Sequence, residues 1–195
     1  MSPTTRPIEG VMPARPRFLV FIGTSLDGFI ARLDGAIDWL HDANAQVPAG
    51  EDCGYAAFMA SVDALVMGRK TFETVLAFGE WPYGEQAVYV LSHSLTVLPP
   101  AVPPTVRLVR GPLPEIVEAL RERGHRRVYL DGGATIQAFL AAGLVDELTI
   151  TRLPLLLGAG RPLFGPLPHD VPLSHASTRV YPFGFVQSTY AIRCP

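Results

Sequence analysis

A pair of basic residues follows a short apolar run in the segment MGRKTFE, residues 67–73. Gly68 ends the run, and Arg69, Lys70 and Thr71 open a stretch with helical spacing; Lys70 is the only lysine of the chain. Cations at the start of a helix oppose the helix dipole, at a cost on the order of 0.3–1 kcal/mol. A bound anion would remove this conflict, so the segment is a candidate phosphate site.

Two further segments place glycines or hydroxyl groups directly after an apolar run. One is Ser92-His93-Ser94, and the other is Asp131-Gly132-Gly133-Ala134-Thr135, which opens a helical pattern. Paired glycines let a backbone approach a ligand closely, and the free N–H groups of a helix start favour phosphate. Taken singly, a glycine pair is more often a tight turn. The three segments together favour a ligand that carries phosphate.

The elements that must position these segments alternate along the chain. Short apolar runs typical of buried strands occupy 18–23, 63–67, 87–91, 106–109 and 128–130. Helical spacing is found at 55–62, 71–78, 113–120 and 136–140. This alternation predicts an α/β fold, with a mostly parallel central sheet flanked by helices. Ligands of such sheets bind at the carboxyl ends of the strands, where the three segments lie.

After Gly143 the apolar period changes from helical spacing to two. Leu148 and Ile150 are expected on one face of a strand, with Thr149 and Thr151 on the other. Residues 171–181 and 185–193 flank the short turn 182–184, which predicts an antiparallel hairpin at the sheet edge.

Composition limits the class of protein. The 195 residues are 48% apolar and 17% charged, which fits one globular domain, and a net charge of −2 with scattered arginines gives no footprint for nucleic acid or an anionic membrane. Residues 1–16 are expected to be a disordered tail and 17–195 the domain. No apolar stretch approaches the ~18–20 residues of a membrane span, and the two cysteines are expected to be free thiols in a reducing cytoplasm.

Several reaction classes lack their motifs. Neither the cysteines nor the histidines have the spacing of metal ligands, so no metal is predicted. There is no Gly-x-Ser-x-Gly elbow, no P-loop and no Rossmann glycine fingerprint that opens a helix.

Four segments carry a family resemblance. SLDGFIA (25–31), MGRKTFE, YVLSHS (89–94) and the stretch from LDGGATIQ to RPLF (130–164) resemble, in that order, the dihydrofolate reductase superfamily, with its three-layer fold. The likeness is greatest to stand-alone proteins related to the reductase domain of the bifunctional riboflavin-biosynthesis deaminase-reductase, and it covers about Arg17 to Arg193. The resemblance implies a cytoplasmic, homodimeric, NADPH-dependent reductase. It would transfer hydride to a C=O or C=N group of a small substrate, with pterin-like and pyrimidine-like heterocycles as candidates.

The resemblance also assigns the cofactor residues. By this resemblance, Gly68, Arg69, Lys70 and Thr71 would approach the phosphates. The basic residue of this group would lie with Ser92 and His93 near the adenosine 2′-phosphate, and Leu91 belongs to the same cofactor site. Asp131, Gly132, Gly133, Ala134, Thr135 and Ile136 would form the pyrophosphate site, with Gly23, Ile30 and Ala31 along the nicotinamide.

The substrate side is predicted from fewer residues. Asp27 could orient the substrate or relay a proton as the catalytic residue, and it could equally be a turn aspartate before Gly28. Asp38 and Trp39 could form a wall of the substrate pocket, and Thr151 matches a threonine that faces the substrate. By default Trp39 would be core and Thr151 the polar face of a strand.

Two departures from the family pattern narrow the function. Asn44 stands where folate reductases place a carboxylate, with Asp42 out of register, so folate is a doubtful substrate. The zinc-deaminase signature is absent. Two alternatives stay open: the reductase of riboflavin synthesis that acts on the ribosylamino-pyrimidine phosphate, and a non-catalytic NADPH-binding module.

Overall fold

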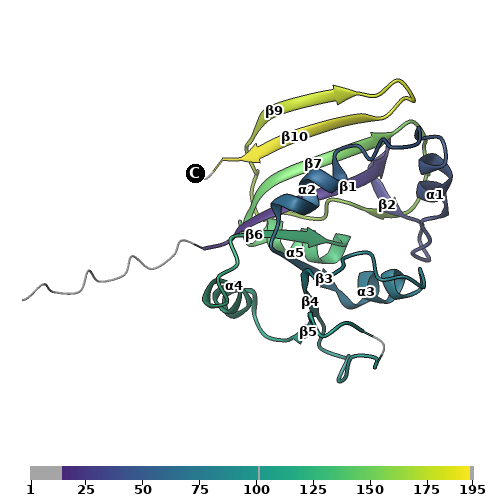
Figure 1. The fold of residues 1–195 in the computed structure, drawn as a ribbon. Coiled ribbons are helices and arrows are strands. Elements are labelled where there is room, and N and C mark those ends of the chain that lie inside the picture. Colours follow the sequence, from purple (N-terminus) through teal and green to yellow (C-terminus); the bar gives the residue numbers. More distant parts are fainter. Residues whose placement is uncertain (1–14, 101, 194–195) are drawn as a thin grey trace, which may run out of the picture.

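The computed structural model describes residues 15–100 and 102–193, and its centre is an eight-stranded sheet in the order β5-β4-β3-β6-β1-β7-β10-β9 (Figure 1). All strand pairs from β5 to β7 are parallel, whereas β10 pairs antiparallel with both β7 and β9. The strands are β1 (Arg17–Ser25), β3 (Ala64–Gly68), β4 (Ala87–Leu91), β5 (Val106–Val109), β6 (Arg127–Asp131), β7 (Val145–Leu153), β9 (Leu173–Val180) and β10 (Val186–Ile192). The predicted mostly parallel sheet and its C-terminal antiparallel hairpin are confirmed.

Helices cover both faces of the parallel part of the sheet. On one face, α4 (Leu113–Glu122) and α5 (Gly133–Ala141) pack Leu120 and Phe139 against Phe18 and Leu130. On the other face lie α2 (Tyr55–Ser61) and α3 (Arg69–Leu76). Strands covered on both faces are apolar at successive positions, which explains the continuous apolar runs of β3 and β4. The result is the predicted three-layer arrangement.

A smaller third cluster forms beyond the carboxyl end of the first strand. The short helix α1 (Asp38–Asn44) buries Trp39 against Leu153 and Phe185. Beside it, β2 (Phe29–Ala31) and β8 (Arg161–Pro162) form a separate two-stranded antiparallel ribbon.

The helix boundaries differ slightly from the predicted ones. The third helix begins at Arg69 rather than Thr71 and ends at Leu76, so both basic residues belong to its first turn. On β7, Leu148 and Ile150 join the core under α4 and α5. Thr149 and Thr151 face the other way, as predicted, but they are buried rather than solvated.

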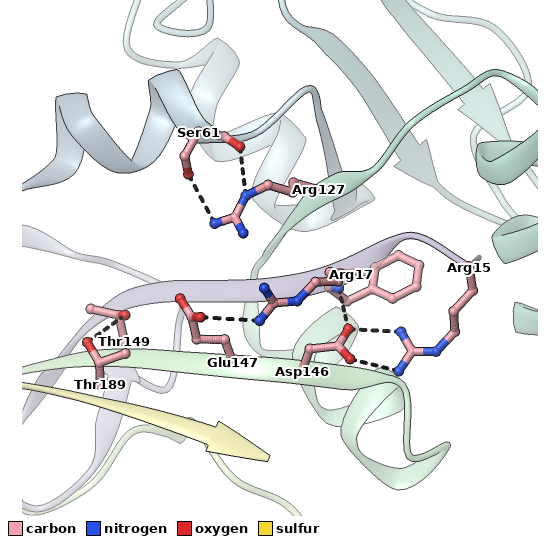
Figure 2. A network of polar contacts seen from close by, with 9 residues as sticks. Arg15, Arg17, Ser61, Arg127, Asp146, Glu147, Thr149 and Thr189 are labelled. Atoms are coloured by element: carbon pink, nitrogen blue, oxygen red, sulfur yellow. Dashed lines mark hydrogen bonds and ion pairs between the residues drawn. The ribbon is translucent and has the colours of Figure 1, made fainter. Parts of the chain in front are cut away.

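A bulge interrupts the parallel pairing of β1 with β7 near the start of β1. Phe18 pairs with Val145 and Leu19 with Glu147, so Asp146 has no partner on β1. Its carboxylate instead accepts the N–H of Phe18 at 2.7 Å and both terminal nitrogens of Arg15 at 2.8 Å (Figure 2). Residues 1–14 of the predicted tail lie outside the described residues, whereas Arg15 and Pro16 belong to the described structure.

Candidate functional site

The carboxyl ends of β4, β3, β6 and β1 form a continuous row, because these strands are neighbours in the sheet. The three predicted segments follow β4, β3 and β6, so the fold brings them together. A Cβ on Gly132 would overlap Thr71 Oγ1, and a Cβ on Gly68 would lie 3.3 Å from Thr135 Oγ1. Thr71 thus packs against Gly132, and Thr135 packs against Gly68.

Two helices start at this row with free N–H groups. Gly68 precedes α3 and Gly132 precedes α5; neither helix has a side-chain cap or an acidic residue in its first turn. Gly132 has φ +87°, a conformation that other residues adopt at a cost. Uncapped helix starts with a positive backbone dipole are suited to a pyrophosphate, so the residues present fit a dinucleotide.

A cavity of about 330 Å³ lies at one end of the row. Its lining includes three predicted cofactor residues, Leu91, Ser92 and His93, together with Arg110 from the end of β5. Arg110 was missed by the sequence reasoning, although it follows an apolar run just as the other strand-end segments do. The cavity combines a guanidinium with a hydroxyl and an imidazole, groups that bind phosphate esters.

The two basic residues that open α3 are placed differently. Arg69 forms an ion pair with Glu73 one turn later, at 2.7 Å. Lys70 is exposed. An exposed i,i+4 pair of this kind is weak, so a phosphate could compete with Glu73 for the guanidinium.

A larger cavity, of about 620 Å³, lies at the other end of the row, between the sheet, α1 and the loop before α2. Gly23 at the end of β1 lines it, as does Thr151 on the neighbouring β7. Gln187 on β10 donates to both Thr151 Oγ1 and the Cys53 carbonyl, which fastens the loop to the sheet. The full lining is Phe21, Ile22, Gly23, Leu40, Asn44, Val47, Pro48, Ala49, Gly50, Glu51, Asp52, Cys53, Tyr55, Thr151, Leu153 and Phe185.

The predicted substrate residues are not all found around this cavity. Thr151 lines it, and so does Asn44, the residue at the position of the missing carboxylate. Trp39 is buried in the third cluster, and Asp38 forms a two-bonded ion pair with Arg32 at 2.7 and 2.9 Å. Neither Trp39 nor Asp38 is among the lining residues.

Asp27 organises a loop instead of facing either cavity. Its carboxylate accepts hydrogen bonds from Ser25 Oγ at 2.6 Å and from the N–H groups of Leu157 and Gly158 at 3.1 and 2.8 Å. These bonds, the one from Ser25 first, lower the pKa of Asp27. An ionised carboxylate with its oxygens occupied is a poor proton donor near neutral pH, so the geometry supports the turn interpretation.

The carboxylate of Asp131 lies in a group of tyrosines. Tyr83 donates to its carboxylate at 3.2 Å, and Tyr129, which donates to the Phe21 carbonyl, lies beside it. The residue is partly exposed, but its carboxyl is enclosed, and burial raises its pKa. Burial likewise raises the pKa of Tyr55, which lines the larger cavity, to about 12. Tyr55 is a neutral hydroxyl that the sequence reasoning missed.

The remaining predicted cofactor residues differ in their surroundings. Ile30 approaches Gly133 so closely that a Cβ there would lie 2.6 Å from Ile30 Cδ1, and Ala31 is buried beside it. Ala134 is exposed in the first turn of α5. Ile136 is fully buried, and its N–H bonds to the Gly132 carbonyl, so neither its side chain nor its amide faces the row of strand ends.

The described residues contain neither a metal-binding cluster nor a helix that could span a membrane. Within 15–100 and 102–193, no group of three or more histidine, cysteine, aspartate or glutamate residues is placed to hold a metal ion. No helix in the same ranges has the length and apolar character needed to cross a membrane.

Comparison with known proteins identifies the family of the chain. The family model of the RibD C-terminal domain matches residues 16–186. The uncharacterized protein YwjB of Bacillus subtilis (strain 168) is 30% identical over 166 residues, which cover 84% of this chain and 91% of that protein.

Three solved structures share the fold of this chain. A putative riboflavin biosynthesis protein from Shewanella sp. PV-4 is 43% identical, with a TM-score of 0.85 over 91% of this chain and 99% of that one. Dihydrofolate reductase from Enterococcus faecalis, complexed with NADP(H), is 17% identical with a TM-score of 0.60 and covers 91% of this chain and 97% of that one. A Thermotoga maritima deaminase/5-amino-6-(5-phosphoribosylamino)uracil reductase is 16% identical with a TM-score of 0.67, over 92% of this chain and 57% of that one. At such identities the last two likenesses establish the fold alone.

Proposed function

Because the chain belongs to the RibD C-terminal domain family, we propose that it is an NADPH-dependent reductase that transfers hydride to a C=O or C=N group of a small heterocyclic substrate. The observation that carries the proposal is the row of strand ends. It joins the cavity beside Arg110 to the larger cavity at Gly23, and two uncapped helix starts lie between them. An extended dinucleotide with phosphates at its centre matches that arrangement.

Different residues would bind different parts of the cofactor. Ser92, His93 and Arg110 would hold the adenosine 2′-phosphate, and the amides that follow Gly132 would hold the pyrophosphate. Gly23 would lie under the nicotinamide, where the absence of a side chain leaves room for the ring. When bound, the nicotinamide supplies the hydride.

The larger cavity would orient the substrate. Its apolar walls exclude water from the reacting carbon, and Asn44, Tyr55 and Thr151 offer hydrogen bonds to a heterocycle. In this proposal the proton for the reduced group comes from water rather than from Asp27, because that carboxylate is occupied by Ser25, Leu157 and Gly158.

The experiment that tests the proposal compares titrations with NADPH and NADH, followed by nicotinamide fluorescence. A charge-assisted bond to the 2′-phosphate should favour NADPH by roughly 10–100-fold. We expect Arg69→Ala and Arg110→Ala each to remove part of this preference and the double variant to remove most of it. Arg107→Ala, an exposed arginine of the same β5 strand, is the matched control and should leave the preference unchanged.

Two results would contradict the proposal. Equal affinity for the two nucleotides would exclude a 2′-phosphate site, and no binding of either at micromolar concentration would exclude the reductase. Tight NADPH binding with no turnover across carbonyl, imine and pterin substrates would favour the non-catalytic module instead.

A further inference from the structure

The charges around the larger cavity are unusual for a site that would receive a phosphorylated substrate. None of the described residues that line it is lysine, arginine or histidine. Its only charged lining residues are two neighbouring acids, Glu51 and Asp52. A phosphate ester carries up to two negative charges and normally requires arginine, lysine or free N–H groups.

The nearest guanidinium to these acids is already engaged. Arg179 on β9 forms an ion pair with Glu51 at 3.2 Å, and its guanidinium carbon lies 4.5 Å from the centre of the Tyr181 ring. The other oxygen of Glu51 accepts the N–H groups of Asp52 and Cys53. Arg179 therefore balances Glu51 rather than adding positive charge to the cavity.

The N–H groups of residues 51–56 in the same loop already have hydrogen-bond acceptors. Asp52 accepts the N–H of Gly54 at 2.8 Å and that of Ala56 at 2.7 Å, where α2 begins. These bonds lower the pKa of Asp52, so the group is ionised at neutral pH. An ionised carboxylate thus forms part of the cavity wall.

Arg152 on β7 faces the side of the sheet opposite to the cavity. Side chains alternate along β7, so Arg152 lies opposite to its neighbour Thr151, which lines the cavity. The remaining lining residues are uncharged: they include the apolar Leu40, Leu153 and Phe185 and the polar Asn44, Tyr55 and Thr151.

We propose that the larger cavity binds a heterocycle that is uncharged or cationic and carries no phosphate. The proposal rests on the proposed reductase function and specifies its substrate class. It separates this chain from a reductase of ribosylamino-pyrimidine phosphates, because that substrate would bring a dianion beside Asp52 and Glu51.

The charge of the cavity can be measured without knowing the substrate, because Cys53 lines it. In a full-length Cys194→Ser variant, Cys53 is the only thiol. Its rates of reaction are measured with two methanethiosulfonate reagents, one bearing trimethylammonium and the other sulfonate. The ratio of the two rates, divided by the same ratio for free 2-mercaptoethanol, cancels the intrinsic reactivity of the thiol. We expect the cationic reagent to be favoured by roughly threefold or more.

Two further variants assign that preference to the cavity. Asp52→Asn should bring the normalised ratio close to one. Glu122→Gln, which removes an exposed charge on the distant α4, should leave it unchanged. A ratio of one or below in the unmodified cavity overturns the proposal.

The substrate class is then tested with matched pairs in the presence of NADPH. The probes are 5-amino-6-ribosylaminouracil and pyridoxal, each with and without its 5′-phosphate, and binding is read as protection of Cys53 from methyl methanethiosulfonate. We expect the phosphate-free member to protect at a concentration at least tenfold lower. Equal or better protection by the phosphate esters, or no protection by any probe at millimolar concentration, overturns the proposal. Failure of NADPH binding alone would leave the preference for the cationic reagent intact, so the two failures are distinguishable.

Discussion

At the scale of single residues, the direction of a side chain decides what a motif residue does. Asp131 precedes the glycine pair, and its enclosed carboxyl lies among Tyr83 and Tyr129. Asp27 lies in a motif just past β1, yet its oxygens bind a loop. Both residues lie near the ends of strands, but spacing in the sequence does not reveal which way a strand-end side chain turns.

The enclosed carboxyl of Asp131 should make stability depend on pH. When the pKa of a carboxyl is raised in the folded state, its burial costs no folding free energy below the unfolded-state pKa of about 3.9. The cost grows as pH rises through the folded-state pKa. Asp131→Asn keeps an acceptor for the Tyr83 hydroxyl and removes the buried charge. We therefore expect its melting temperature, relative to the unmodified protein, to rise between pH 4 and pH 8.

The control for this pH series is Asp42→Asn, which alters an exposed carboxylate on α1. Its melting temperature should follow that of the unmodified protein across the series. A difference for Asp131→Asn that is constant with pH, or that shrinks as pH rises, would show that the carboxyl is not penalised by burial.

At the scale of elements, the site depends on two strand-to-helix loops that interlock. Gly132 has a positive φ, and any side chain on it would meet Thr71 of the neighbouring helix. Gly132→Ala should therefore destabilise the fold by more than the ~1 kcal/mol of backbone strain alone and weaken NADPH binding. Urea unfolding and the NADPH titration measure the two effects.

A matched control separates strain from collision. Gly124 has nearly the same φ, +83°, but a Cβ there would contact nothing within 4 Å. Gly124→Ala should show the strain alone and leave NADPH binding unchanged, and adding Thr71→Ala to Gly132→Ala should recover part of the lost stability. Equal losses for the two alanine variants would mean that the loops do not interlock as described.

The elements themselves were largely predictable. Strands covered on both faces leave continuous apolar runs, and these runs located β1, β3, β4, β5 and β6. The ribbon of β2 and β8 was not predicted, because its strands are three and two residues long and one contains Pro162. Most of the lining of the larger cavity was missed, since Phe21, Cys53, Tyr55 and Phe185 meet only through the tertiary fold.

At the scale of the whole molecule, Asp146 on β7 holds the first described residues, from Arg15 to Phe18, against the sheet. Asp146→Ala removes the pair with Arg15 and leaves the N–H of buried Phe18 without its acceptor (Figure 2). An unpaired buried N–H costs about 1–3 kcal/mol, so we expect a loss of that size in the free energy of unfolding. Urea denaturation followed by circular dichroism measures it.

Its neighbour supplies the control. Glu147 pairs with Arg17 at 3.4 Å on a more exposed part of the same strand, so Glu147→Ala should cost no more than ~1 kcal/mol. If both variants lose the same amount, the bulge at Asp146 has no special part in holding β1 to β7.

The two tryptophans give the molecule optical reporters at different parts of the site. Trp39 precedes Leu40, which lines the larger cavity, whereas Trp81 packs edge-on against Phe72 of α3 and against Tyr83, the partner of Asp131. Both indole N–H groups are buried without a hydrogen-bond partner. Emission from buried indoles overlaps the absorption of reduced nicotinamide, so both should lose intensity when the dinucleotide binds. A Trp81→Phe variant would then follow the filling of the larger cavity through Trp39 alone, in real time and without a label.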